Sequence, residues 1–243
     1  MLRSDWPSSR PVRPAGWGWD GLLLAAFVAL TVALANGRLL ALDLAVRDWF
    51  DRRQGAHLLA VVLNKLGQGG MILMPLSALL AAALIYRTRS LRPALPIAGA
   101  FVLTALTIGP LKYWLVRGYP HRDGLAHPER LFSDPAHGSA YPSGHVANAI
   151  VWYGVIALLV RAVLRAYGRA PLPAVALLAI RIAPPAILFA TTTYLGYHWL
   201  TDAVAGLLLG LLLDRLLSRV PWDDLPLPAR LRDWGTSAAL TVR

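Results

Sequence analysis

The chain has 243 residues, of which 56% are hydrophobic and 15% are charged, whereas a soluble domain is about 25% charged. This composition excludes an ordinary soluble globular domain. The formal net charge is +11, but the basic residues flank apolar segments instead of forming one patch, so nucleic acid is not an expected partner. The sequence has no cysteine, which excludes disulfides, iron–sulfur clusters and zinc sites built from thiolates.

Apolar runs long enough to cross a bilayer recur along the chain. A span needs about 20 residues, since each residue of a helix rises about 1.5 Å and the hydrocarbon core is roughly 30 Å thick. Between the first two runs, residues 43–66 alternate apolar with charged side chains, which is typical of interfacial helices on a membrane surface. The sequence therefore predicts an all-α, polytopic membrane protein with six transmembrane helices and this interfacial segment. The predicted spans are at about residues 21–42, 69–86, 94–116, 146–164, 174–196 and 199–217.

The two ends of the chain differ in composition from its middle. Residues 1–18 are rich in proline and arginine, and residues 222–243 are polar and contain no further apolar run. We predict that they are weakly ordered tails on one membrane domain, residues 19–221. Cytoplasmic segments carry an excess of Lys and Arg, and the tails and the loops on their side hold most of the arginines. We therefore expect cytoplasmic tails, a plasma-membrane location and an extracytoplasmic loop at about residues 117–141.

Ionisable residues gather where predicted spans reach that outer face. One lies near the end of the third span, a group opens the fourth span, and two bracket the connection between the fifth and the sixth. Such groups are costly to bury in lipid unless a partner or a cavity compensates. Each has an ordinary structural explanation, as a snorkelling lysine, a helix cap or a hydrogen-bonded pair, but their coincidence on one face indicates a site. The residues are Lys112, Ser143, Gly144, His145, His198 and Asp202.

The start of the fourth span favours phosphate as the ligand. A helix that begins at Ser143 and Gly144 points unpaired backbone N–H groups outward, and glycine lets an anion approach them closely. The Ser143 hydroxyl is a further donor, and Lys112 adds a positive charge. We therefore predict that Lys112, Ser143 and Gly144 bind a phosphate group.

Two histidines beside a bound phosphate can divide the chemistry of its transfer. One attacks phosphorus while the other protonates the departing oxygen. We expect His198 to be the nucleophile, because Asp202 lies one turn later and can orient it, and we expect His145 to be the acid. The histidines of the outer loop fit no regular zinc spacing. We therefore expect neither a metal nor another cofactor.

Two motifs resemble those of the type 2 phosphatidic acid phosphatase superfamily. They are Pro-Ser-Gly-His at residues 142–145, and His198 followed by Asp202 and Gly206. This superfamily includes lipid phosphate phosphatases, undecaprenyl pyrophosphate phosphatases and vanadium haloperoxidases. The resemblance covers roughly residues 20–217 and includes the six-span plan. It implies that His198 forms a phosphohistidine intermediate, that Asp202 orients it, and that the remaining predicted residues serve as the acid and the phosphate ligands.

Two positions depart from that resemblance, because Tyr119 and Thr192 stand where the superfamily has arginines that hold phosphate. Each charge-assisted contact is worth about 1.5–3 kcal/mol, so two uncompensated losses would slow catalysis by roughly a hundredfold or more. We hypothesise that Arg117 supplies the missing charge, with Arg122 and Arg130 of the adjacent loop as other sources. The alternative is that Tyr119 and Thr192 donate neutral hydrogen bonds to the substrate.

Together these features predict an integral-membrane phosphatase that hydrolyses a polyprenyl or glycerolipid phosphate or pyrophosphate at the extracytoplasmic face. Its expected partners are this lipid substrate and the bilayer. Two alternatives stay open: transfer of the phosphoryl group to an alcohol would make the protein a lipid phosphotransferase, and loss of the two arginines would leave a catalytically weak, lipid-binding pseudophosphatase. Haloperoxidase activity is the least expected, because vanadate binding would also require those arginines.

Overall fold

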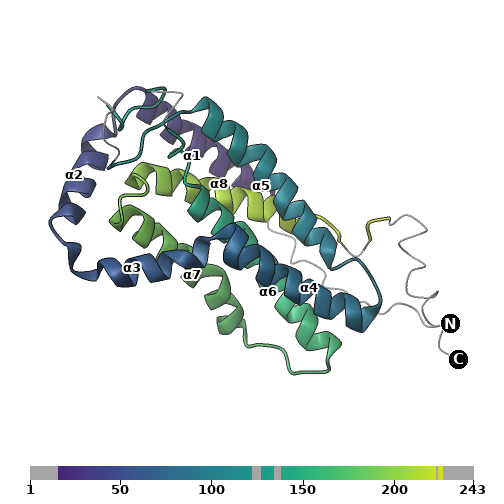
Figure 1. Ribbon diagram of the computed structural model, residues 1–243. Helices are drawn as coiled ribbons and strands as arrows, with labels where there is room; N and C mark the ends of the chain where they lie inside the picture. The colour runs from purple at the N-terminus through teal and green to yellow at the C-terminus, as the bar shows by residue number, and fades with distance from the viewer. Residues whose placement is uncertain (1–15, 122–126, 134–137, 223, 227–243) are drawn as a thin grey trace, which may run out of the picture.

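The computed structural model describes residues 16–121, 127–133, 138–222 and 224–226. The named elements within these residues are all helices (Figure 1). The α-helices are α1 (Trp17–Ala35), α2 (Leu40–Asp51), α3 (His57–Asn64), α4 (Met74–Thr88), α5 (Ala94–Trp114), α6 (Gly144–Ala166), α7 (Ala174–Tyr194) and α8 (Leu200–Ser218). Short helical turns connect some of them: η1 (Gln54–Ala56), η2 (Lys65–Gly67) and the π-helical turn η3 (Gly69–Leu73).

The prediction of an all-α, polytopic membrane protein is confirmed. Five helices are long and apolar enough to cross a membrane, namely α1, α4 with the end of η3, α5, α6 and α7. The sixth predicted span is α8, whose 19 residues extend for about 28 Å but include three charged side chains. The first predicted span ends too late, because Gly37 adopts a φ of 75° and the chain turns there into α2.

Helix α6 lies at the centre of the bundle. Of its 18 most apolar residues, 67% are buried, compared with 17–22% in the other four spans, and it packs against α4, α7 and α8 (Figure 1). Glycines bring α8 close to it: a Cβ on Gly206 would lie 2.5 Å from the carbonyl oxygen of Ser143, and one on Gly210 would lie 2.9 Å from Cα of Ala147. Small residues one turn apart allow such close approach of helix backbones. This packing sets the start of α8 against the start of α6.

The start of α1 and the end of α8 lie together at one end of the bundle. Nε of Arg215 donates to Oδ1 of Asp20 at 2.6 Å, and Arg219 also pairs with Asp20. At the same end, Nη1 of Arg92 donates to the carbonyl oxygen of Trp222 at 3.1 Å, so the predicted C-terminal tail begins with a packed residue. The opposite end, called the pocket end below, carries the ends of α5 and α7 and the starts of α6 and α8.

The predicted interfacial segment forms α2 and α3, which border the pocket end (Figure 1). Helix α3 packs against α7, and the turn η2 that follows it is held from two sides. The hydroxyl of Tyr153 in α6 donates to the carbonyl oxygen of Leu66 at 3.1 Å, and a Cβ on Gly67 would lie 2.7 Å from the side chain of Leu188 in α7. This segment is therefore part of the bundle as well as of its surface.

Candidate active site

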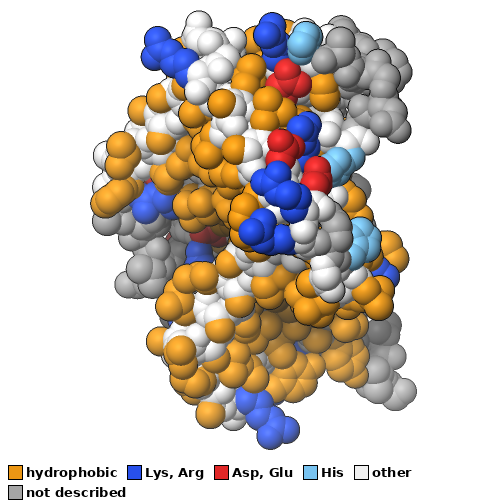
Figure 2. Space-filling view, turned by 90° about the vertical axis from the view of Figure 1, so that its left-hand side faces the viewer, with side chains coloured by type: hydrophobic (Ala, Val, Ile, Leu, Met, Phe, Trp, Pro, Cys, Tyr) orange, Lys and Arg blue, Asp and Glu red, His pale blue; other side chains and the backbone are white. Residues whose placement is uncertain are grey.

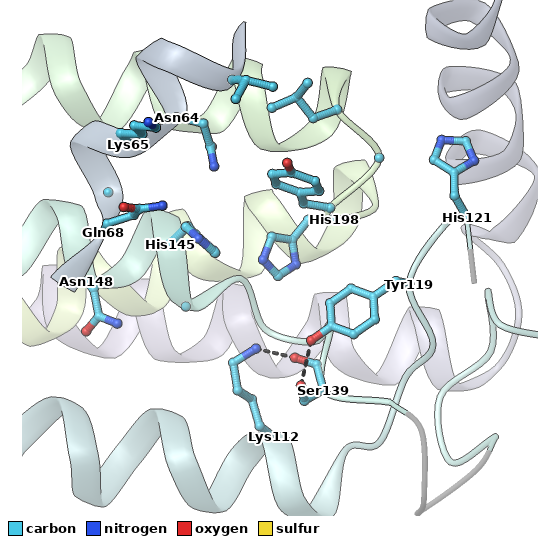
Figure 3. A pocket seen from close by; sticks show the side chains of 16 residues that line it. Asn64, Lys65, Gln68, Lys112, Tyr119, His121, Ser139, His145, Asn148 and His198 are labelled. Atoms are coloured by element: carbon cyan, nitrogen blue, oxygen red, sulfur yellow. Dashed lines mark hydrogen bonds between the residues drawn. The ribbon is translucent and has the colours of Figure 1, made fainter. Parts of the chain in front are cut away.

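A pocket of about 880 Å³ opens at the pocket end, between the tips of α5 and α6, the connection from α7 to α8, and the segment α3–η2. Charged and histidine side chains gather on this side of the molecule within a hydrophobic surface (Figure 2). Two lysines and three histidines line the pocket, and no carboxylate of the described residues does. Such a lining favours an anionic ligand. Figure 3 labels the lining residues Asn64, Lys65, Gln68, Lys112, Tyr119, His121, Ser139, His145, Asn148 and His198, and Tyr197 also lines the pocket.

The two predicted catalytic histidines face each other across this pocket. His145 is the second residue of α6, and His198 lies in the connection before α8; the centroids of their rings are 5.6 Å apart. His198 is buried and His145 is half-buried. The ring of Tyr119 lies on the other side of His198, with its centroid 6.2 Å away. The structure therefore brings both histidines within reach of one phosphoryl group.

Asp202 lies behind His198, on the side away from the pocket. Its Oδ2 is 3.7 Å from Nδ1 of His198, which is too long for a hydrogen bond, and Nδ1 is a buried atom without a hydrogen-bond partner among the described residues. Oδ2 instead accepts from the backbone N–H of Trp199 at 2.9 Å. Because Nδ1 faces the carboxylate, Nε2 is the ring nitrogen available to the pocket. Catalytic hydrogen bonds are often long without substrate and shorten when it binds.

Lys112, in the last turn of α5, reaches the pocket beside the start of α6. Its Nζ donates to the carbonyl oxygen of Ser139, and the hydroxyls of Tyr119 and Ser139 are hydrogen-bonded at 2.7 Å (Figure 3). A Cβ on Gly144 would lie 3.3 Å from Cε of Lys112, so the glycine leaves room for this lysine. The first amides of a helix have no partner within it. An anion beside Lys112 can therefore meet the amides of Gly144 and His145.

Two of the predicted phosphate ligands use their hydroxyls inside the protein. Ser143 is fully buried; its Oγ accepts from the backbone N–H of Val146 at 3.4 Å, which caps α6. Thr192 is also fully buried, and its Oγ1 donates to the carbonyl oxygen of Leu188 in its own helix at 2.6 Å. Neither residue lines the pocket. The structure therefore does not bring them to the place where a phosphate would bind.

Arg117, hypothesised to replace a missing phosphate arginine, is buried beneath the pocket and does not line it. Its guanidinium donates to Oδ1 of Asp202 at 2.5 Å, to Oδ2 of Asp43 at 2.6 Å, to Oγ1 of Thr201 at 2.8 Å and to the carbonyl oxygen of Glu129 at 2.9 Å. Burial opposes its charged form, but the carboxylates of Asp202 and Asp43 outweigh burial and raise the pKa of Arg117. Four of its five N–H donors are thus committed to the protein itself.

The buried ion network includes a residue that the sequence did not mark as part of the site. Asp43 of α2 is 1% exposed; besides Arg117, it accepts from the backbone N–H of Thr201 at 2.9 Å and from its hydroxyl at 2.6 Å. In the sequence, Asp43 is a carboxylate of an amphipathic segment. Such a carboxylate is normally solvated, so nothing marked this one as part of the site. Of the two other proposed sources of charge, Arg122 lies outside the described residues, and Arg130 is exposed and does not line the pocket.

Other pocket residues were also missed by sequence reasoning. Asn64, Lys65 and Gln68 fall in or beside the segment that was assigned to the membrane surface, and Ser139 lies in a loop with no motif. No sequence signal distinguishes them from ordinary polar surface residues. Among the described side chains, no group of three or more His, Asp or Glu residues could hold a metal ion.

Comparisons with known proteins agree with this architecture. A family model described as the PAP2 superfamily matches residues 93–225. The fold is similar to the crystal structure of the first transmembrane PAP2 type phosphatidylglycerolphosphate phosphatase from Bacillus subtilis, with a TM-score of 0.64 and 23% sequence identity over 82% of this chain and 93% of that chain. No curated protein matches the chain. The matched residues hold Lys112, His145, His198 and Asp202, whereas α3 and η2 precede them.

Proposed function

The chain belongs to the PAP2 superfamily, and on that premise we propose that it is a membrane phosphatase that hydrolyses a lipid phosphate or pyrophosphate in this pocket through a phosphohistidine intermediate. The observation that carries the proposal is the facing pair of His145 and His198 in a pocket lined by lysines and histidines. A nucleophile and an acid beside a cationic ligand set are what phosphoryl transfer through an enzyme-bound intermediate requires.

The transferred phosphoryl group binds beside Lys112 and the first turn of α6. Lys112 and the first two residues of α6, Gly144 and His145, line the same pocket, and Tyr119 borders it from the side of His198. A lysine and a helix N-terminus each favour negative charge. In this chain, Lys112 and the start of α6 take the place of the phosphate-binding arginines of the superfamily.

Hydrolysis then proceeds in two steps. Nε2 of His198 attacks phosphorus, the bond between phosphorus and the bridging oxygen breaks, and His145 gives its proton to the departing lipid. A water molecule, deprotonated by His145, then attacks the phosphohistidine and breaks the bond between phosphorus and nitrogen, which releases inorganic phosphate and restores both histidines.

The buried ion network holds the nucleophile in place. Asp202 faces Nδ1 of His198 and stabilises the ring as it gains a substituent and positive charge at Nε2. Arg117 fixes Asp202 from below, and Asp43 of α2 fixes Arg117. In this proposal Arg117 is a positioning residue instead of a phosphate ligand.

An apolar groove adjoins the pocket beside Lys112. It has a volume of about 700 Å³, shares Lys112 and Ser139 with the pocket, and is otherwise lined by Tyr113, Trp114, Val116, Phe132 and Gly138. Among the described residues, the arginines between α4 and α5, between α6 and α7, and at the end of α8 lie at the opposite end of the bundle, which supports an extracytoplasmic pocket in the plasma membrane.

The proposal is tested by phosphate release from purified protein, with a panel of lipid monophosphates and diphosphates. We expect release by the wild type, and neither release nor an acid-labile phosphoenzyme with His198→Ala. His127→Ala is the matched control, because His127 is an exposed loop histidine outside the pocket. Release that persists in His198→Ala, or its absence in the wild type with every lipid of the panel, contradicts the proposal. An added acceptor alcohol shows whether the same intermediate transfers its phosphoryl group.

A further inference from the structure

The chain has 24 basic residues, and Lys65 and Lys112 are its only lysines. Both line the pocket. Lys112 belongs to the phosphate-binding set described above, but Lys65 belongs to η2, which lies outside the residues that the family model matches. Its presence in the pocket therefore needs an explanation of its own.

The backbone that carries Lys65 is held rigidly against the catalytic helices. The carbonyl oxygen of Leu66 accepts from Tyr153 of α6 at 3.1 Å, and Gly67 packs against α7 without room for a side chain. On the other side of Lys65, Oδ1 of Asn64 accepts from the hydroxyl of Thr191 in α7 at 3.2 Å. Lys65 thus projects from an ordered wall of the pocket.

The side chain of Lys65 is not used by the protein itself. It is exposed, and no described residue forms a hydrogen bond or ion pair with its ammonium group, whereas Lys112 donates to Ser139. Figure 3 shows Lys65 and Gln68 on one side of His145 and Lys112 on the other. The pocket therefore presents positive charge on both sides of the proposed acid.

We propose that Lys65, together with the side-chain amide of Gln68, forms a second anion subsite that binds a charged leaving group. The inference rests on the proposed function. His198 attacks phosphorus from one side and His145 protonates the oxygen that departs, so the part of the substrate that lies past His145 is the leaving group. A cation there selects a head group with a second phosphate, that is, a lipid diphosphate.

The subsite has a defined part in the first step. The bond between the terminal phosphorus and the bridging oxygen breaks, and its electron pair stays on that oxygen, which becomes part of the departing lipid monophosphate. His145 supplies the proton, and Lys65 neutralises charge that the departing phosphate keeps. A lipid monophosphate, whose leaving group is an uncharged alcohol, gains much less from Lys65.

The test compares farnesyl diphosphate with farnesyl monophosphate as substrates of the purified protein. Lys65→Met keeps the apolar stem and removes the charge; it should lower kcat/KM for the diphosphate by about 10- to 100-fold and reduce the preference for diphosphate at least about tenfold. Lys65→Arg should recover most of this loss. Arg53→Met is the matched control, because Arg53 is an exposed cation of the neighbouring segment outside the pocket, and it should leave both substrates unaffected.

A binding measurement separates this inference from the proposed function. In His198→Ala protein, methylenediphosphonate should raise the thermal unfolding midpoint more than methylphosphonate does, and Lys65→Met should remove that difference. Equal losses for both substrates would place Lys65 on the transferred phosphate and overturn the inference, as would a preference that Lys65→Met leaves intact. Loss of the proposed function alone would appear as phosphate release that does not depend on His198, with the diphosphonate preference still dependent on Lys65.

Discussion

Two polar regions share the pocket end, the lining of the pocket and the ion network beneath it. The lining carries Lys65 and Lys112 and no described carboxylate, so its positive charge is balanced only when an anion enters. In the network both carboxylates are paired within the protein, because Arg117 bridges Asp43 and Asp202 with no side chain exposed. We infer that the two lysines of the lining bind a ligand, whereas Arg117 stabilises the fold. Substitutions in the network should act on stability, and those in the lining on turnover.

The largest effect is expected from Arg117→Ala. It leaves two buried carboxylates unpaired, which costs about 3–5 kcal/mol of stability and lowers the thermal unfolding midpoint by about 6–20 °C. The measurement is thermal unfolding of the purified protein in detergent. Arg47→Ala is the control, since the pair of Arg47 with Asp48 is partly exposed and contributes about 0–1 kcal/mol. An unchanged midpoint combined with lost turnover would instead make Arg117 a phosphate ligand.

Lys112→Met should show the opposite pattern. Removal of one charge-assisted contact to the transferred phosphate lowers kcat/KM by about 10- to 150-fold, while the unfolding midpoint changes much less than in Arg117→Ala. Phosphate release and thermal unfolding, measured on the same preparation, give both quantities. Arg130→Met removes an exposed loop cation outside the pocket and serves as the control. A stability loss as large as that of Arg117→Ala would assign Lys112 to the supporting network.

Gly206→Ala tests whether the close packing of α8 against the start of α6 is needed for the geometry of the pocket. The added Cβ would lie 2.5 Å from the carbonyl oxygen of Ser143, so α8 and the start of α6 must separate, at a cost of about 1–3 kcal/mol. We expect a lower unfolding midpoint. We also expect slower phosphate release, because the displaced start of α6 carries His145. Gly109→Ala is the matched control, since a Cβ there meets nothing within 4 Å. Equal behaviour of the two variants would contradict the close packing.

Ser143→Ala tests whether this serine only caps α6 or also binds the substrate phosphate. If its hydroxyl only caps α6, as its bond to Val146 indicates, the substitution costs about 0.5–2 kcal/mol of stability and kcat/KM changes only a few-fold. The same pair of measurements applies. A drop in kcat/KM of more than about tenfold, equivalent to about 1.4 kcal/mol, at an unchanged midpoint would return Ser143 to the phosphate ligands.

Much of the helical plan could be predicted from the sequence, because apolar length and helix breakers act locally. The predicted starts of the third and fifth spans coincide with those of α5 and α7. The first span was predicted to end at residue 42, because its apolar character continues past Gly37, but the backbone of that glycine ends the helix at Ala35. The length of an apolar run can be read from composition, but the position of a turn within that run is much harder to predict.

The candidate site was predicted in part. Lys112, Gly144, His145 and His198 meet in one pocket, as the polar residues at the tips of three predicted spans indicated. Side-chain direction was less predictable. Thr192 stands where the resemblance expects a phosphate arginine, but its hydroxyl bonds to its own helix, and no spacing rule reveals that choice.

Hydropathy, helix caps and motif spacing were enough to predict a membrane-spanning helical protein with reactive polar residues at one end, because they are properties of neighbouring residues. Which cation faces a ligand depends instead on how the helices pack. Arg117 turns inward because Asp43, 74 positions away, reaches it from α2. Lys65 reaches the pocket because α6 and α7 hold η2 in place. Contacts between segments so distant in the chain leave no local pattern, since they depend on how the helices pack.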